Sequence, residues 1–218
     1  MLDPRFPEVR RALAAYASDA DDPPLGASSS TIEAAVAVVL RGRPDDLDLL
    51  LIKRARSDRD PWSGHMALPG GRHDATDESL LHTAVRETRE ETGVLLEPSS
   101  GVVSGPLGAL PFVAPSGPGL PPIRISPWVF GVPAHTEARV ASDEVAEIHW
   151  VSLATLTDPA VQGDVDMPVP GGPRAFPCFH VAGEIVWGLT YRILDDLITR
   201  LDGFTFPLPT PGSPPTPR

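Results

Sequence analysis

The chain has 218 residues, of which 41% are hydrophobic and 22% charged, a composition typical of one globular domain with tails or a small appendage. A formal net charge of −11 without a basic stripe excludes a nucleic-acid polymer as the expected partner, although local arginines or a bound metal would still admit a small anion. The one cysteine, Cys178, excludes an internal disulfide, and no apolar run reaches the roughly 20 residues of a membrane span. We therefore expect a cytoplasmic protein without membrane contact.

The N-terminal part, residues 1–30, is expected to form a helix and a linker arm. Residues 5–17 place Phe6, Val9 and Leu13 at helical spacing on one side. The rest of the arm is acidic and rich in proline, glycine and serine, which is typical of a linker. Such an arm could pair with a second copy of the chain in a homodimer.

Residues 31–203 carry the apolar patterns of the main folded domain. Apolar and β-branched runs bounded by turn residues predict strands over residues 31–40, 48–54 and 123–132. The glycine-rich residues 101–109 are expected to form a strand after a turn, and residues 142–151 a turn followed by a strand. Turns or loops are expected over residues 41–46, 111–122 and 158–175. A hairpin turning at residues 182–184 and an amphipathic helix over residues 186–201 are predicted to follow. The proline-rich remainder, residues 204–218, is typical of a disordered tail.

A further helix is predicted after a Pro-Gly-Gly turn and a polar loop in the middle of the chain. Thr76 or Asp77 is expected to cap this helix, with Glu78 in its first turn. Leu80 and the small and apolar residues that follow at helical spacing form its inward stripe. Gly93 stands where a helix usually ends.

The same helix carries a cluster of carboxylates. Glu87, Glu90 and Glu91 are spaced i, i+3 and i+4, which places them on one face, opposite the apolar stripe. Like charges at this spacing destabilise an isolated helix by roughly 0.2–0.5 kcal/mol per pair. A hard cation such as Mg²⁺ would instead bind these oxygens and complete its shell with waters and substrate phosphates. The alternative is a solvated acidic face with Arg86 and Arg89 as counter-charges.

The string RETREETGV, which begins at Arg86, resembles the second half of the Nudix hydrolase box, R-E-U-x-E-E-x-G-U. The first half of the box, G-x5-E-x7, begins at Gly71. Counting forward from Gly71 puts Asp77 in the glutamate position, whereas counting back from Arg86 puts Glu78 there, and a loop longer by one residue reconciles the two counts. The resemblance covers roughly residues 31–200. It implies an α/β (α+β) protein with the Nudix fold, in which a mixed β-sheet is sandwiched between α-helices.

The resemblance also implies hydrolysis of a nucleoside diphosphate linked to another moiety. Mg²⁺ or Mn²⁺ would bind Glu87 and Glu91, helped by Glu90 and by the carbonyl of Gly70. The metal would polarise the pyrophosphate and lower the pKa of a bound water. Arg86 would orient the glutamates.

A second resemblance, to the coenzyme A pyrophosphatase branch, lies upstream in LLIKRARSDRDPWSGHMALPGG. The motif of that branch is L-L-T-x-R-[SA]-x3-R-x3-G-x3-[FW]-P-G-G. The chain departs from it at Ile52, at Leu68 and by one extra residue between Arg59 and Gly64. The run IVWGLT over residues 185–190 is similar to the I-W-G-x-T stretch of that branch. The implied substrate is coenzyme A or an acyl derivative, cleaved to 3′,5′-ADP and a phosphopantetheine.

Five residues outside the carboxylate cluster complete the expected site. Arg54 and Arg59 are candidate phosphate ligands, together with Gly71, because a guanidinium presents paired donors to phosphate oxygens. The alternative for both arginines is surface pairing with nearby aspartates. Glu144 and Glu147 lie where Nudix enzymes often place an extra acidic group, so each could be a metal ligand through the substrate, a general base or merely a cap.

Two other functions remain open. The chain could hydrolyse another diphosphate, such as ADP-ribose, a nucleotide sugar or an oxidised dNTP. It could also be a non-catalytic Nudix domain that senses a ligand, although a sensor has no need to keep all three box glutamates.

Overall fold

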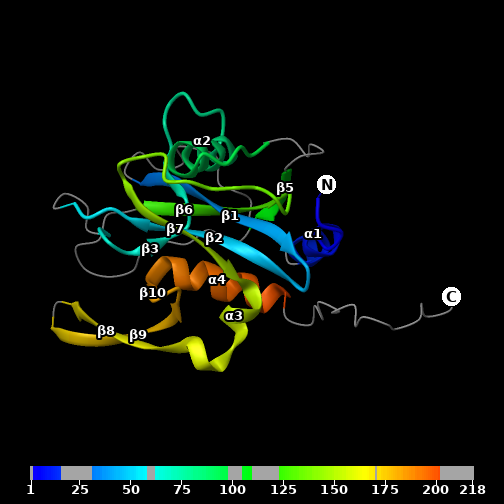
Figure 1. Cartoon of the computed structure of the whole chain (residues 1–218). Coiled ribbons are helices and arrows are strands. Elements are labelled where there is room, and N and C mark those ends of the chain that lie inside the picture. Colours follow the sequence, from blue (N-terminus) through cyan, green and yellow to red (C-terminus); the bar gives the residue numbers. More distant parts are fainter. Residues whose placement is uncertain are drawn as a thin grey trace, which may run out of the picture.

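A mixed sheet forms the centre of the structure, with helices on both of its faces (Figure 1). The computed structural model describes residues 2–15, 31–57, 62–97, 105–109, 123–169 and 171–201. The helices are α1 (Phe6–Ala15), α2 (Leu80–Thr92), α3 (Leu153–Thr157) and α4 (Gly188–Leu201), with one 3-10 turn, η1 (Pro159–Val161). The strands are β1 (Ile32–Arg43), β2 (Asp46–Arg54), β3 (Met66–Ala67), β4 (Gly70–Arg72), β5 (Gly105–Ala109), β6 (Ile123–Val132), β7 (Val145–Ser152), β8 (Gln162–Val169), β9 (Gly172–Val181) and β10 (Glu184–Trp187).

Strand β1 is the central strand of the main sheet. It runs antiparallel to β2 and β4 and parallel to β6, while β2 also pairs with β3 and β7, and β6 with β5. Helix α2 covers one face of this sheet, and α4 lies against the other (Figure 1). This arrangement confirms the predicted mixed sheet between helices.

The two faces of β1 explain its nearly continuous apolar sequence. Ala35 and Val39 are buried in the core that includes Ala84 of α2, whereas Val38 and Leu40 are buried in the core that includes α4. A strand covered on both faces has no polar side, so the alternation typical of a half-exposed strand is absent.

Helix α1 packs into the same core as α4. Phe6, Val9 and Leu13 are all buried in that core, as their helical spacing predicted. The ring of Phe6 lies so close to Gly131 of β6 that a Cβ there would come within 2.6 Å of it. The described part of the N-terminal segment therefore contributes to the core of the domain, and the predicted linker falls outside the described residues.

Several predicted boundaries were wrong. Strand β1 continues to Arg43, so the turn expected over residues 41–46 is confined to the two residues before β2. The loop predicted over residues 158–175 is instead η1, β8 and the start of β9, and β8, β9 and β10 form a separate three-stranded sheet. In the second half of β8, exposed and half-buried residues alternate, as in a strand with one face toward solvent. This alternation was missed in the sequence because prolines and glycines in the segment favoured a loop. The last helix begins at Gly188, because Trp187 still pairs with Cys178.

Other predicted segments lie outside the described residues, namely 16–30, 58–61, 98–104, 110–122 and 202–218. In the part that is described, no helix is both long enough and apolar enough to cross a membrane.

If α1 is part of the core, Phe6→Ala should lower the free energy of unfolding by about 3 kcal/mol, because it empties a buried site. Urea denaturation measures this change. Arg11→Ala, at an exposed position of the same helix, is the control and should stay within about 0.5 kcal/mol of the wild type. A Phe6→Ala protein as stable as the control would show that α1 does not pack as described.

Candidate active site

Helix α2 begins later than its sequence predicts. Its N-cap is Ser79, whose side chain accepts a hydrogen bond from the backbone N–H of His82 at 3.3 Å. Neither Thr76 nor Asp77 caps the helix. Its C-terminal end was predicted correctly, since Gly93 adopts a left-handed φ of 69° and its N–H donates to the carbonyl of Arg89.

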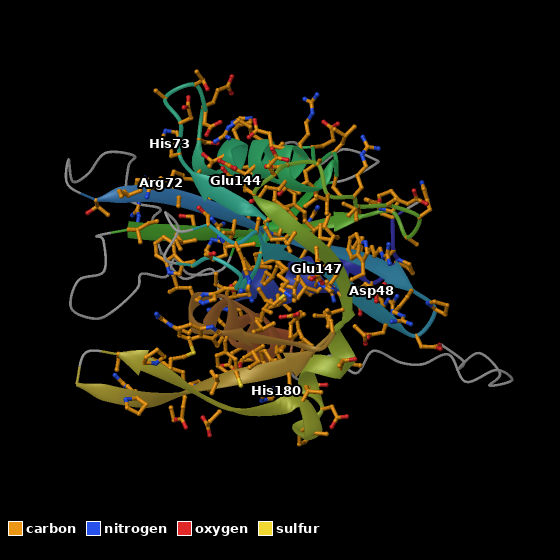
Figure 2. The ribbon with its side chains drawn as sticks, turned by 60° about the vertical axis from the view of Figure 1, so that its left-hand side comes forward. Asp48, Arg72, His73, Glu144, Glu147 and His180 are labelled. Atoms are coloured by element: carbon orange, nitrogen blue, oxygen red, sulfur yellow. The ribbon has the colours of Figure 1, made fainter. Side chains whose placement is uncertain are left out.

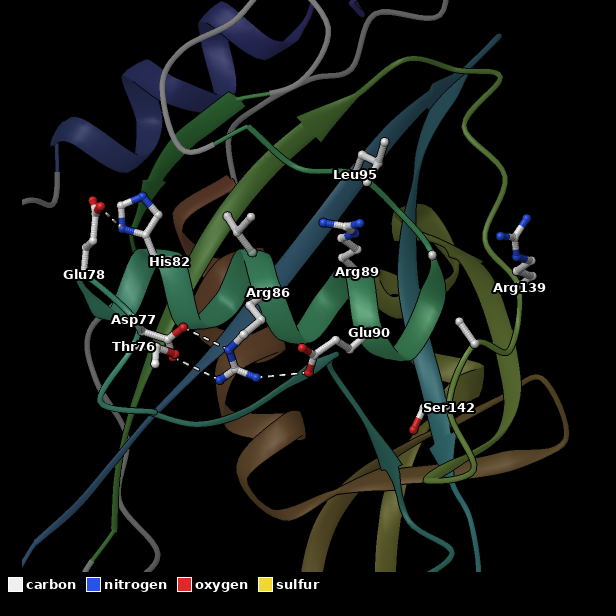
Figure 3. A pocket seen from close by; sticks show the side chains of 13 residues that line it. Thr76, Asp77, Glu78, His82, Arg86, Arg89, Glu90, Leu95, Arg139 and Ser142 are labelled. Atoms are coloured by element: carbon white, nitrogen blue, oxygen red, sulfur yellow. Dashed lines mark hydrogen bonds and ion pairs between the residues drawn. The ribbon is translucent and has the colours of Figure 1, made fainter.

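Asp77 is the acidic partner of Arg86 (Figure 3). The Nε of Arg86 donates to Oδ1 of Asp77 at 2.9 Å and its Nη2 donates to Oδ2 at 3.0 Å. This pairing holds the pKa of Asp77 far below its ordinary value, with further help from Thr83. Glu78 points elsewhere, with 85% of its side chain exposed and its carboxylate 3.7 Å from His82. Of the two counts that the sequence allows, the one that starts at Gly71 therefore identifies the residue that binds Arg86.

Arg86 also holds two of the three clustered glutamates. Its Nη1 donates to Oε1 of Glu87 at 2.9 Å and to Oε2 of Glu90 at 3.1 Å. The repulsion expected between these carboxylates is offset by one guanidinium, which leaves the second oxygen of each glutamate outside this contact.

Glu91 does not share the exposed face predicted for it, because it is only 3% exposed. Its Oε2 accepts a hydrogen bond from the backbone N–H of Gly70 at 2.9 Å. Burial raises the pKa of Glu91 to about 8, and the charge of Glu87 adds to this, while Gly70 and Arg54 act in the opposite direction. Burial also raises the pKa of Glu87, which is partly buried. Solvent exposure therefore decreases across the cluster, from the exposed Glu90 through the partly buried Glu87 to the buried Glu91.

The two glycines of the Pro-Gly-Gly turn allow the backbone to reach these carboxylates. A Cβ at Gly71 would lie 2.4 Å from Oε1 of Glu87. Gly70 has a φ of 154°, and a Cβ there would lie 2.3 Å from the carbonyl oxygen of Ala35 in β1. A side chain at Gly71 would force the turn away from α2, and one at Gly70 would force it away from β1.

The other predicted site residues separate into two groups. Arg54 and Glu144 lie near the cluster, since the charge of Arg54 acts on Glu91 and that of Glu144 acts on both Glu87 and Glu91. Glu144 is exposed, beside α2 in Figure 2, and its carbonyl accepts from the N–H of Ala55 at 2.7 Å.

Glu147 points to a different set of partners. It pairs with Lys53 at 3.2 Å and His149 at 3.1 Å, and it lies within β7, whereas Glu144 precedes that strand (Figure 2). Hydrogen bonding to Lys53 lowers the pKa of Glu147. Arg59 lies outside the described residues.

The described residues do not form a complete protein cage for a metal, because no three His, Cys, Asp or Glu side chains among them are grouped closely enough. The oxygen donors nevertheless fit Mg²⁺ or Mn²⁺. A buried carboxylate with a raised pKa, a partly buried second one and an exposed third offer a few oxygen ligands. Mg²⁺ usually takes only one or two carboxylates and fills its shell with waters and substrate phosphates.

Comparison with known proteins agrees with this fold. The NUDIX domain family model matches residues 31–167, which is more than half of the chain. The uncharacterized Nudix hydrolase NudL of Salmonella paratyphi B is 30% identical over 169 residues, covering 78% of this chain and 82% of that protein. The chain belongs to the Nudix hydrolase family.

One further relative matches only part of the chain, and one solved structure matches it at low sequence identity. The uncharacterized protein C14C4.10c of Schizosaccharomyces pombe is 40% identical over 114 residues, or 52% of this chain, and the match spans about a third (34%) of that longer protein. A solved MutT/nudix family protein of Enterococcus faecalis aligns with a TM-score of 0.53 at 18% identity, covering 90% of this chain and 74% of that chain. At this identity the structural similarity shows the fold alone.

The Asp77–Arg86 pair should stabilise the fold, and Glu78 should not. Asp77→Asn should lower the free energy of unfolding at pH 7 by about 2 kcal/mol, because a charged hydrogen-bond partner is lost. Glu78→Gln is the matched control and should change it by less than about 0.5 kcal/mol. The lowered pKa of Asp77 means that its contribution is present above its unfolded pKa of about 3.9 and is lost as the pH falls below it. The difference between the two variants should therefore shrink near pH 2, and equal stabilities at pH 7 would contradict the assignment.

Without metal, the buried charge of Glu91 should destabilise the protein at alkaline pH. Its folded pKa of about 8 lies above the unfolded value, so its ionisation costs stability as the pH rises from about 4.3 to 8. Glu91→Gln in EDTA should then be more stable than the wild type by roughly 2–4 kcal/mol at pH 8 and nearly equal to it at pH 4. Thermal or urea unfolding at the two pH values measures this. A loss of stability at pH 8 would show that the carboxylate is well compensated as it stands.

Proposed function

We propose that this Nudix hydrolase cleaves the diphosphate bond of a nucleoside diphosphate derivative, with coenzyme A or an acyl-coenzyme A as the substrate. The observation that carries the proposal is the position of Glu91, a buried carboxylate of raised pKa that is held against a glycine turn by the N–H of Gly70. Strongly perturbed carboxylates of this kind concentrate at functional sites.

Glu87 and Glu91 would hold Mg²⁺ or Mn²⁺, helped by Glu90 and by the carbonyl of Gly70. When bound, such an ion polarises the diphosphate and lowers the pKa of a bound water. Arg86 keeps Glu87 and Glu90 in position through its hydrogen bonds to both. Substitution of Glu87 or Glu91 would remove an oxygen ligand, and the remaining carboxylates would then bind the cation too weakly.

Arg54 and Arg59 would bind phosphate oxygens beside Gly71, and Glu144 would act as the general base. In hydrolysis the water oxygen bonds to one phosphorus, the bridging P–O bond breaks, and the leaving phosphate carries away the bridging oxygen. Glu144 takes the proton of the water. It suits this role better than Glu147, because Glu147 is already paired with Lys53 and His149.

The choice of coenzyme A rests on the upstream motif. Arg54, Gly64 and the Pro-Gly-Gly turn match that motif, and the turn does contact the box carboxylates. Ile52 and Leu68, where the chain departs from it, are both buried in the domain, so these two departures concern packing. ADP-ribose, nucleotide sugars and oxidised dNTPs are the competing substrates, and a non-catalytic ligand sensor is the competing function.

The 218-residue chain should be incubated with Mg²⁺ or Mn²⁺ and a panel of coenzyme A, acetyl-coenzyme A, ADP-ribose, nucleotide sugars and oxidised dNTPs, with products followed by mass. We expect 3′,5′-ADP to be released faster than any other product, and EDTA to abolish the reaction. A preference for another diphosphate would reject coenzyme A and keep the hydrolase, whereas no turnover on any substrate would favour the sensor.

In the same assay, Glu91→Gln should lower kcat by about a hundredfold or more, because it removes an oxygen ligand from the metal. Glu8→Gln, at an exposed position of α1, is the control and should turn over at the wild-type rate. Near-normal activity of a folded Glu91→Gln protein would reject the proposed site.

A further inference from the structure

Thr83 is a fully buried polar residue of α2. Its hydroxyl oxygen lies 2.8 Å from Oδ2 of Asp77 and 3.1 Å from Nδ1 of His73. Both partners belong to the loop between β4 and α2, so Thr83 connects two points of this loop to the helix. A buried hydroxyl that contacts a carboxylate and an imidazole ring requires a definite arrangement of protons, because it has only one proton to donate.

The charges of these groups decide the direction of the hydrogen bonds. Pairing with Arg86 holds the pKa of Asp77 far below its ordinary value, so this carboxylate is ionised and can only accept. The carbonyl of Ser79, 3.3 Å from the same hydroxyl, already accepts from the backbone N–H of Thr83. The hydroxyl proton is therefore donated to Asp77, and the hydroxyl oxygen accepts from His73, whose Nδ1 must carry a proton.

The central sheet fixes the position of His73. Its backbone N–H donates to the carbonyl of Glu33 in β1 at 2.9 Å, directly after the pairing of Arg72 with Ala34. Only 22% of its side chain is exposed, where the loop toward α2 begins (Figure 2). The hydrogen bonds therefore start from a residue that is held by the sheet and end at a carboxylate in the loop.

Both oxygens of Asp77 are used in this arrangement. Oδ1 accepts from Nε of Arg86, while Oδ2 accepts from Nη2 of Arg86 and from Thr83 (Figure 3). The paired bonds between the two charged groups fix their relative orientation. Because Nη1 of the same guanidinium donates to Glu87 and Glu90, a rotation of the Asp77 carboxylate would move this donor away from both glutamates.

We propose that Thr83 and His73 are positioning residues of the proposed metal site. His73 holds the hydroxyl of Thr83, Thr83 holds the carboxylate of Asp77, and Arg86 carries this orientation to Glu87. This inference rests on the proposed function, because it takes Glu87 as a ligand of the cation. If the two residues served the fold alone, their loss would lower stability and leave the metal affinity of the folded protein unchanged.

Calorimetric titration of the 218-residue chain with Mn²⁺ tests this difference. Thr83→Val keeps the shape of the side chain but removes the hydroxyl, and it should weaken Mn²⁺ binding by about tenfold. Thr83→Ser keeps the hydroxyl and should bind Mn²⁺ as the wild type does. Thr88→Val is the matched control, because it removes another fully buried hydroxyl of α2, which donates to the carbonyl of Ala84 at 2.7 Å. This control should keep the wild-type affinity, and circular dichroism checks that each titrated variant is folded.

His73 is partly exposed and gives a second pair of variants that leave the core intact. His73→Asn places an amide N–H as many bonds from Cα as Nδ1 of the imidazole, so it should bind Mn²⁺ nearly as the wild type does. His73→Leu removes the donor and should weaken binding as Thr83→Val does. In EDTA at mildly alkaline pH, ¹⁵N nuclear magnetic resonance of the wild type should show the proton of the neutral His73 ring on Nδ1, a result that needs neither metal nor turnover.

Equal Mn²⁺ affinities of the wild type, Thr83→Val and His73→Leu would overturn the inference while the proposed hydrolysis stands. A loss of affinity in Thr88→Val as large as in Thr83→Val, or a neutral His73 ring with its proton on Nε2, would also overturn it. Weaker Mn²⁺ binding by the Thr83→Val and His73→Leu variants of a chain that hydrolyses nothing in the substrate panel would support the inference and reject the proposed function.

Discussion

The hydrogen bond from the backbone N–H of Gly70 to the buried carboxylate of Glu91 is the contact on which the rest of the site depends. A carboxylate removed from water is unfavourable unless hydrogen bonds or a cation compensate it. To supply this bond, the turn must approach both α2 and β1 so closely that neither Gly70 nor Gly71 has room for a side chain. The pairing of β4 with β1 then fixes the turn, and with it the distance between the central sheet and the box helix.

Arg86 organises the outer half of the same site. One guanidinium binds Asp77, Glu87 and Glu90, so it ties the loop before α2 to the carboxylates in the second half of that helix. Of the two helix carboxylates with which it pairs, Glu90 is exposed and Glu87 is partly buried, while Glu91 is buried beside the turn. The site is thus divided into an exposed part at Glu90 and a buried part at Glu91.

Much of this arrangement could be predicted from local sequence patterns. The continuous apolar run of β1, the end of α2 at Gly93 and the placement of the box on a loop and a helix all follow from rules of short range. The partner of Arg86 could not be predicted. Because the loop is longer by one residue, the box spacing points equally well to Asp77 and to Glu78, and only the three-dimensional path of the loop selects Asp77. The burial of Glu91 also escaped prediction, since helical spacing gives a face but not the approach of the Pro-Gly-Gly turn. Arg139 is distant in sequence, and only the docking of its loop brings its backbone N–H to the carbonyl of Thr92 at the end of α2.

The proposed site requires Glu87 and Glu91 to bind a divalent cation together. Titration of Mn²⁺ followed by electron paramagnetic resonance measures that binding directly and needs no knowledge of the substrate. We expect Glu91→Gln to bind Mn²⁺ at least about tenfold more weakly than the wild type, because a buried oxygen ligand is lost. Equal affinity of the two proteins for Mn²⁺ would contradict the proposed site.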